Sequence, residues 1–215
     1  MLRHVDALLR GLGRHAVGGG RVPWVSVLVL GSATGFGYGA VMGFWGGRPL
    51  QAFYSGVKVP ILLGLSTLIC LPSFFVLNTV LGLRDDFAAA CRGVLVAQGT
   101  VAVALAGLAP LTAVAYLSSS DYALATVLNG GMFALAAIGG QAMLARHYRP
   151  LIAANPRHRI GLAVWLVLYV FVAVQLAWML RPFVGAPGLP TAFFRDEAWG
   201  NAYVHVFEAV RQLLR

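Results

Sequence analysis

The side chains that are suited to acid–base or anion-binding chemistry lie mainly in two basic segments. In one segment, Asp85 and Asp86 follow Arg84. The other segment holds His147 and His158. Four arginines accompany these histidines: Arg146, Arg149, Arg157 and Arg159. Basic residues at helix ends ordinarily fix the topology of a membrane protein, and that is the interpretation we favour for these arginines. Because guanidinium groups form paired hydrogen bonds with phosphate, they are also candidates for contact with lipid headgroups.

No spacing in the sequence matches a common catalytic or metal-binding motif. The chain has no HExxH sequence, no nucleophile elbow and no P-loop, and its two cysteines, Cys70 and Cys91, are far apart. We therefore expect no cofactor, no metal and no enzymatic activity. The alternative within this class is a membrane-embedded enzyme that acts on lipids, with Asp85, Asp86 or the segment 147–159 supplying the acid or base.

A second group of polar side chains surrounds a proline inside an apolar run. Pro72 is flanked by Ser66, Thr67, Ser73 and Asn78. A proline inside a helix removes one backbone hydrogen bond and can kink the helix. These residues are therefore candidates for a hinge or a polar path, and the alternative is a static kink packed against its neighbours.

Four glycines at regular spacing form the sharpest pattern in the chain. Gly31, Gly35, Gly39 and Gly43 are four residues apart, so on a helix they form one groove without side chains. Small residues allow two membrane helices to pack backbone to backbone. We expect this face to be a helix-packing interface, either with another part of the same chain or with a second subunit.

The elements that position these residues follow from the composition. The chain has 215 residues, of which 59% are hydrophobic and 11% are charged. A soluble domain carries about 25% charged residues, so that class is excluded together with disordered and disulfide-rich chains. Five runs are long enough to cross a bilayer core of ~30 Å as helices. They cover residues 22–45, 57–83, 93–117, 122–144 and 160–180.

The predicted fold is an all-α integral membrane protein with three parts. Residues 1–21 have apolar and basic residues at helical spacing, which predicts an amphipathic helix in the headgroup layer. Residues 22–180 form the five-helix transmembrane domain. Residues 181–215 begin with a segment rich in Pro and Gly, and a second interfacial helix is expected to follow. We expect Lys58, near the start of the second run, to extend its amine to the interface beside Tyr54.

The distribution of basic residues predicts an orientation. The net charge of +9 comes from 16 basic and 7 acidic residues. Ten basic residues lie on the side of the N-terminus and six on the other side, which predicts a cytoplasmic N-terminus and an outer C-terminus. The expected location is a bacterial cytoplasmic membrane, and no nucleic acid partner is expected.

Function is expected to depend on helix faces, because little of the chain lies outside the predicted spans. The preferred hypothesis is a non-catalytic membrane scaffold or accessory subunit. It would pack through its glycine-lined face against partner subunits or copies of itself, with membrane lipids around it. The alternative is a small oligomeric channel or transporter for an ion or a small solute.

Overall fold

The described part of the chain, residues 24–195 of a computed structural model, consists of helices and loops without strands. Within these residues, five helices are long and apolar enough to cross a membrane, as the sequence predicted, and they support the class of multi-pass membrane protein. They are α3 (Trp24–Gly43), α4 (Pro49–Val80), α5 (Phe87–Ser118), α6 (Tyr122–Ala154) and α7 (His158–Met179). Short 3-10 turns, η1 (Trp45–Gly47) and η2 (Arg84–Asp86), lie in the connections after α3 and α4. The two predicted interfacial helices fall in residues 1–21 and 196–215, outside the described residues.

Two helices are much longer than their apolar runs predicted. Helix α4 begins at Pro49 rather than at residue 57, and α6 continues to Ala154 rather than ending at residue 144. Pro49 is suited to the first turn, where its missing N–H costs no helical hydrogen bond. The additional turns contain polar residues that are buried against other segments, such as Gln51 in α4 and His147 in α6. An apolar run read from the sequence stops at such polar residues, whereas the helix itself continues through them.

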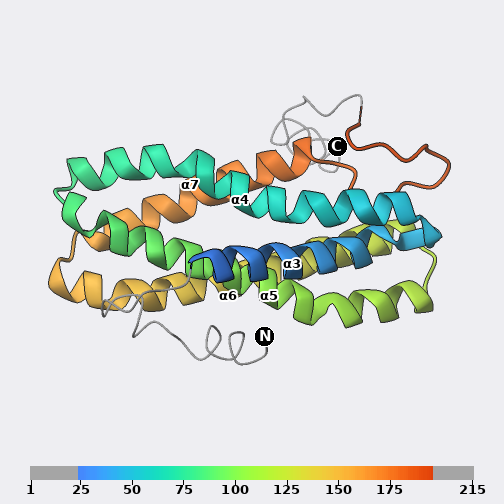
Figure 1. The fold of residues 1–215 in the computed structure, drawn as a ribbon, viewed down its shortest axis with the longest axis horizontal. Helices are drawn as coiled ribbons and strands as arrows, with labels where there is room; N and C mark the ends of the chain where they lie inside the picture. Colours follow the sequence, from blue (N-terminus) through green and yellow to red (C-terminus); the bar gives the residue numbers. More distant parts are fainter. Residues whose placement is uncertain (1–23, 196–215) are drawn as a thin grey trace, which may run out of the picture.

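The helices form an elongated antiparallel bundle in which α3 lies between α4 and α5 (Figure 1). Helix α7 packs mainly along α4, and α6 packs mainly along α5. Helices α4 and α5 contact each other much less, because α3 separates them over much of their length. With 20 residues, α3 is shorter than its neighbours and begins partway along the bundle (Figure 1).

The apolar core has a large cluster in each half of the bundle. One cluster surrounds Tyr38, Met42 and Leu105, where α3, α5 and α6 meet. The other surrounds Phe74 and Trp165, whose rings pack edge to face with centroids 4.9 Å apart. These clusters hold the helices together by close packing, which is the main source of helix association in a lipid environment.

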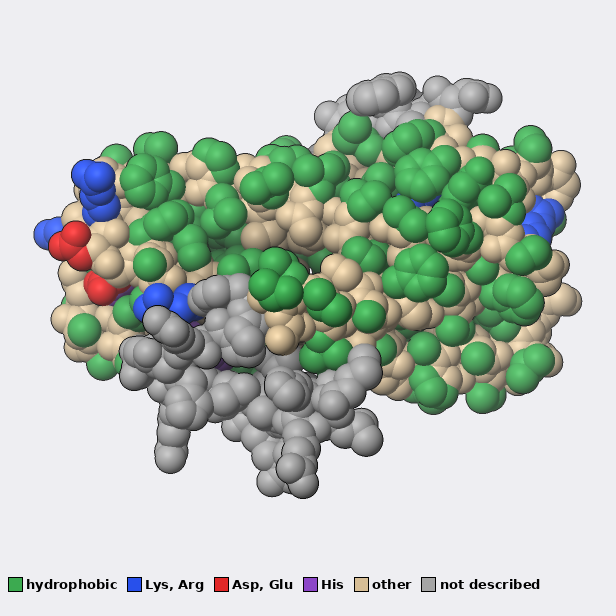
Figure 2. All heavy atoms as spheres, in the orientation of Figure 1, with side chains coloured by type: hydrophobic (Ala, Val, Ile, Leu, Met, Phe, Trp, Pro, Cys, Tyr) green, Lys and Arg blue, Asp and Glu red, His purple; other side chains and the backbone are tan. Residues whose placement is uncertain are grey.

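Charged side chains gather at the two ends of the bundle, and hydrophobic side chains cover the length between them (Figure 2). We call the end with the α4–α5 and α6–α7 connections the arginine-rich end. The opposite end, with the α3–α4 and α5–α6 connections and the segment after α7, is called the lysine end. At the lysine end, the Asp121 carboxylate accepts hydrogen bonds from the backbone N–H groups of Ala123 and Leu124 and so caps α6.

Candidate functional site

The glycine face of α3 packs against helix α4 of the same chain. A methyl group built on Gly39 would overlap the backbone carbonyl of Ser55, and one built on Gly43 would lie 2.5 Å from the carbonyl oxygen of Gln51. At these two positions the backbones of α3 and α4 are therefore in direct contact.

The other two glycines of this face have looser contacts. A methyl group on Gly35 would lie 3.5 Å from Val59 and Pro60 of α4, and one on Gly31 would lie 3.9 Å from Gly99 of α5. All four glycines thus face helices of their own chain. Of the two arrangements that the spacing left open, the structure has the contact within the chain.

A row of buried polar residues on α4 holds the segment that follows α7. Gln51, Ser55 and Lys58 are spaced four and three residues apart, so they share one side of the helix, and each is fully buried. The Gln51 amide and the Lys58 amine donate to the carbonyl oxygen of Pro182, at 2.9 and 2.7 Å. The Ser55 hydroxyl donates to the carbonyl oxygen of Phe183. We call Gln51, Ser55 and Lys58 the polar row.

Lys58 was expected to extend its amine outward beside Tyr54, but the structure has it fully buried, because the segment after α7 covers it. Its amine lies 4.8 Å from the centre of the Phe193 ring, at a distance suited to a cation–π interaction. Among residues 24–195, no carboxylate forms an ion pair with this amine. The neighbouring Arg48 also binds this segment, since its guanidinium donates to the carbonyl oxygens of Ala186 and Leu189. Backbone carbonyls and an aromatic ring thus surround the buried cation.

A hydrogen-bonded network joins three helices near the lysine end. The Tyr38 hydroxyl of α3 donates to Oδ1 of Asn129 in α6, at 2.9 Å. Nδ2 of Asn129 donates to the Tyr116 hydroxyl of α5, at 2.6 Å, and that hydroxyl donates to the carbonyl oxygen of Met42. Nδ2 of Asn129 also donates to the carbonyl oxygen of Ala125 in its own helix, so both polar atoms of the amide have partners.

The polar residues around Pro72 differ in burial. Thr67 and Asn78 are buried, and their side chains donate to the carbonyl oxygens of Leu63 and Phe74 in the preceding turn. Ser66 is also buried in the bundle. Pro72 and Ser73, in contrast, are exposed on the outer side of α4, which continues through Pro72 as one helix. Of the five candidates, Ser66, Thr67 and Asn78 therefore lie inside the bundle, and Pro72 and Ser73 lie on its surface.

The basic segment with His147 and His158 is helical rather than a connecting loop. Arg146 and Arg149 are exposed on α6, and Arg159 is exposed in the first turn of α7. Only residues 155–157 connect the two helices. Arg157 lies in this connection and donates to the carbonyl oxygen of Leu81, so it stabilises the end of α4.

The two histidines of this segment are buried. Nδ1 of His147 contacts the carbonyl oxygen of Met143 one turn earlier. Nε2 of His158 lies 3.0 Å from the Asp86 carboxylate and joins α7 to the α4–α5 connection. This pairing gives Asp86 and His158 a structural role at the arginine-rich end. The sequence did not indicate it, because 72 residues separate the partners.

Helix α6 has the most open glycines of the described helices. A methyl group built on Gly130, Gly131 or Gly139 would meet no atom within 4 Å. Helical spacing places Val127, Leu135 and Ile138 around Gly131, and these three side chains are 57–72% exposed. We call Val127, Gly131, Leu135 and Ile138 the open face of α6. It is an apolar surface with a notch at Gly131, the shape into which a side chain of another helix fits.

The chain matches no protein family, no curated protein and no solved structure in comparisons of sequence and fold. The candidate sites are therefore defined by the geometry of its own residues.

Proposed function

We propose that this protein is a non-catalytic membrane scaffold or accessory subunit that associates with other membrane subunits or with copies of itself. The observation that carries the proposal is the open face of α6, where Gly131 leaves space beside the helix and two further open glycines, Gly130 and Gly139, flank it. A glycine inside a helix costs about 1 kcal/mol relative to alanine, so glycines that face open space weaken the helix unless another helix packs there.

The polar side chains support a scaffold rather than a channel or transporter. Asn129 is used between three helices, and the polar row is used to hold the segment after α7. Among the described residues, no group of three or more His, Cys, Asp or Glu side chains is placed to hold a metal ion. These two groups of polar side chains thus hold parts of the bundle together.

The proposed location is a bacterial cytoplasmic membrane, with the arginine-rich end in the cytoplasm. Six arginines lie at that end: Arg84, Arg92, Arg146, Arg149, Arg157 and Arg159. The lysine end has Arg48, Lys58, Arg181 and Arg195 within the described residues. Because basic residues are retained on the cytoplasmic side, the difference supports this orientation, which leaves the C-terminus on the outer side after five spans.

Native mass spectrometry of the full chain, extracted in its own lipids, tests the proposal. We expect an assembly heavier than the single 22.8 kDa chain, and we expect Gly131→Leu to reduce it to the single chain because the notch is filled. Gly107→Leu is the matched control, since a methyl group at Gly107 of α5 also meets no atom within 4 Å. A parent protein of single-chain mass, or an assembly that is unchanged by Gly131→Leu, would contradict the proposal.

A further inference from the structure

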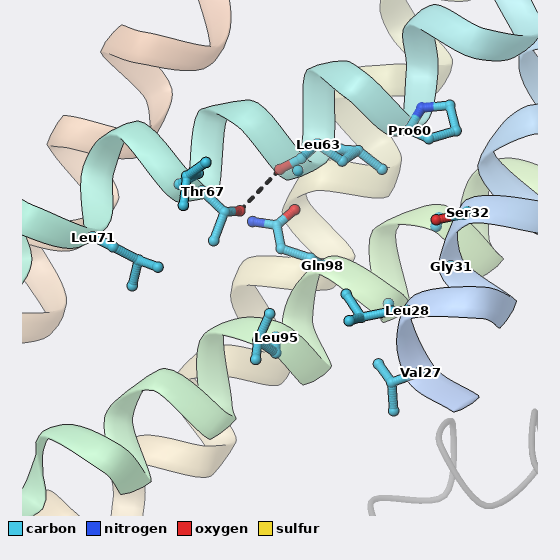
Figure 3. Close-up of a pocket in the computed structure, with 14 residues that line it drawn as sticks. Val27, Leu28, Gly31, Ser32, Pro60, Leu63, Thr67, Leu71, Leu95 and Gln98 are labelled. Atoms are coloured by element: carbon cyan, nitrogen blue, oxygen red, sulfur yellow. Dashed lines mark hydrogen bonds between the residues drawn. The ribbon is translucent and has the colours of Figure 1, made fainter. Parts of the chain in front are cut away.

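A cavity of about 210 Å³ lies among α3, α4 and α5, near the start of α3 (Figure 3). It is larger than the ~150 Å³ apolar cavity known to accept benzene and smaller than the ~300–1,000 Å³ of ordinary ligand pockets. Its lining is mostly aliphatic and includes Leu63 and Leu71 of α4 and Leu95 of α5. The size and lining therefore suit one slender apolar chain.

The cavity opens sideways between α3 and α4. Leu28 of α3 and Leu68 of α4 are among its lining residues, and they are 57% and 62% exposed on the outer surface of the bundle. Both helices are among the five apolar helices that are long enough to span a membrane. A ligand that enters here comes from the lipid phase rather than from water.

One lining residue offers a hydrogen-bond donor. The hydroxyl of Tyr169 on α7 donates to Oε1 of Gln98, at 3.0 Å, and this bond orients the amide. Gln98 extends from α5 toward Thr67 on α4 (Figure 3). Within residues 24–195, no group accepts a hydrogen bond from its Nε2. The amide nitrogen is thus available to a ligand that carries an acceptor such as an ester carbonyl.

The position of the cavity along α5 indicates where the polar part of the ligand would lie. Arg92 is seven residues before Gly99, a lining residue, so the two share one side of the helix. Arg92 is six residues before Gln98, which places it about 9 Å closer to the arginine-rich end. An acidic headgroup at the level of Arg92 would leave its ester groups near Gln98 and its chain in the cavity.

We propose that this cavity binds one acyl chain of an anionic glycerophospholipid, with the Gln98 amide donating to an ester carbonyl and the phosphate lying at the arginine-rich end. The charge of that end, with Arg92 on the same side of α5, complements the phosphate. The site is distinct from the open face of α6, and it defines a specific lipid partner for the bundle.

Photolabelling of the full chain in vesicles tests this proposal. The probe is phosphatidylglycerol with a diazirine in the acyl chain, in a phosphatidylcholine background, and labelled peptides are identified by mass spectrometry. We expect labelling to concentrate on Leu63, Leu71 and Leu95. A phosphatidylcholine probe with the same chain should label them several-fold less.

Variants separate the cavity from general lipid contact. Gly64→Leu should abolish labelling of the cavity, because Gly64 lines it and a methyl group there meets no atom within 4 Å. Gln98→Leu should reduce labelling roughly threefold to tenfold, as expected for one lost hydrogen bond in a membrane. The control Gly107→Leu should leave labelling unchanged, and thermal unfolding of each variant verifies that the bundle is intact.

Three results would overturn the proposal. One is equal labelling of the cavity in the parent and in a folded Gly64→Leu variant. Another is equal labelling by the two lipid probes, which would remove the requirement for an anionic headgroup. The third is cross-linking of residues 1–23 of the chain into the cavity in place of the lipid, detected with a photoreactive amino acid at Leu95.

Discussion

At the scale of single residues, Gly39 occupies the point where α3 comes closest to α4. The carbonyl group of Ser55 fills the space that a side chain at Gly39 would need. The spacing of the four glycines predicted a close helix contact, and the structure has one. The spacing did not identify the partner helix, because a groove without side chains accepts any helix of suitable shape.

We predict that Gly39→Ala lowers the free energy of unfolding by about 1–3 kcal/mol or more, since the added methyl group must push two backbones apart. Gly37→Ala is the matched control on the same helix, because a methyl group there meets no atom within 4 Å. Denaturant titration in detergent micelles measures both changes. Equal stability of the two variants would show that α3 and α4 are not in backbone contact at Gly39.

Asn129 provides the second prediction at this scale. Asn129→Leu removes the acceptor of the Tyr38 hydroxyl and the donor to the Tyr116 hydroxyl, so one buried and one partly buried hydroxyl lose a partner. We expect a loss of about 1–3 kcal/mol in the free energy of unfolding. Tyr38→Phe removes one bond of the same network and should cost less. The result that would contradict this prediction is an Asn129→Leu protein as stable as Tyr38→Phe, or more stable, because the network would then not join the three helices.

At the scale of elements, the polar row joins α4 to the segment after α7. The sequence singled out Lys58 but gave no indication of its partner, because the carbonyl group that accepts its hydrogen bond is 124 residues away. The sequence does contain one indication of this contact, because Gln51, Ser55 and Lys58 are spaced along one side of a helix. It was missed because residues 49–56 were not expected to be helical.

We predict that Lys58→Met loosens this segment. Methionine keeps much of the length of the side chain but cannot donate to Pro182 or form the cation–π contact with Phe193. A cysteine introduced at Ala192 should therefore react faster with a water-soluble maleimide in the Lys58→Met background than in the parent. Leu65→Met, an exposed position on the same helix, is the control and should leave the rate unchanged. Equal rates in all three proteins would show that Lys58 does not hold the segment.

Helix lengths show where prediction from sequence succeeds and where it fails. The number and order of the long helices followed from apolar runs, because only a helix satisfies its backbone in lipid. The ends of α4 and α6 did not follow, since the polar residues there are buried by distant parts of the chain: Gln51 by the segment after α7, and His147 and Tyr148 within the bundle. The pairing of Asp86 with His158 depends on the same long-range packing, so local patterns could not reveal it.

At the scale of the whole molecule, the antiparallel arrangement places the α4–α5 and α6–α7 connections at one end of the bundle and the α3–α4 and α5–α6 connections at the other. We predict that cysteines introduced at Ser119 and Asn155, in the α5–α6 and α6–α7 connections, react with a membrane-impermeant reagent from opposite sides of the membrane. Asn155 should react only in inverted vesicles and Ser119 only in intact cells or spheroplasts. Reaction of both from the same side would contradict the five-span arrangement.

The glycine face of α3 is used within the chain, so the proposed scaffold function depends on the open face of α6. Residues on this face and on α7 are similarly exposed, with Ile138 at 68% and Val167 at 67%. The two surfaces differ in that open glycines lie beside Ile138 on α6. Contact with another subunit should therefore involve Ile138 and leave Val167 in contact with lipid.

Photo-cross-linking in native membranes tests this claim most directly. A benzophenone amino acid is placed at Ile138 in one protein and at Val167 in another, and the adducts are identified by mass spectrometry. We predict a defined protein adduct, with a second copy or one other membrane subunit, from Ile138 and only lipid adducts from Val167. Lipid adducts alone from Ile138, or the same protein adduct from both positions, would contradict the claim that the open face of α6 contacts another subunit.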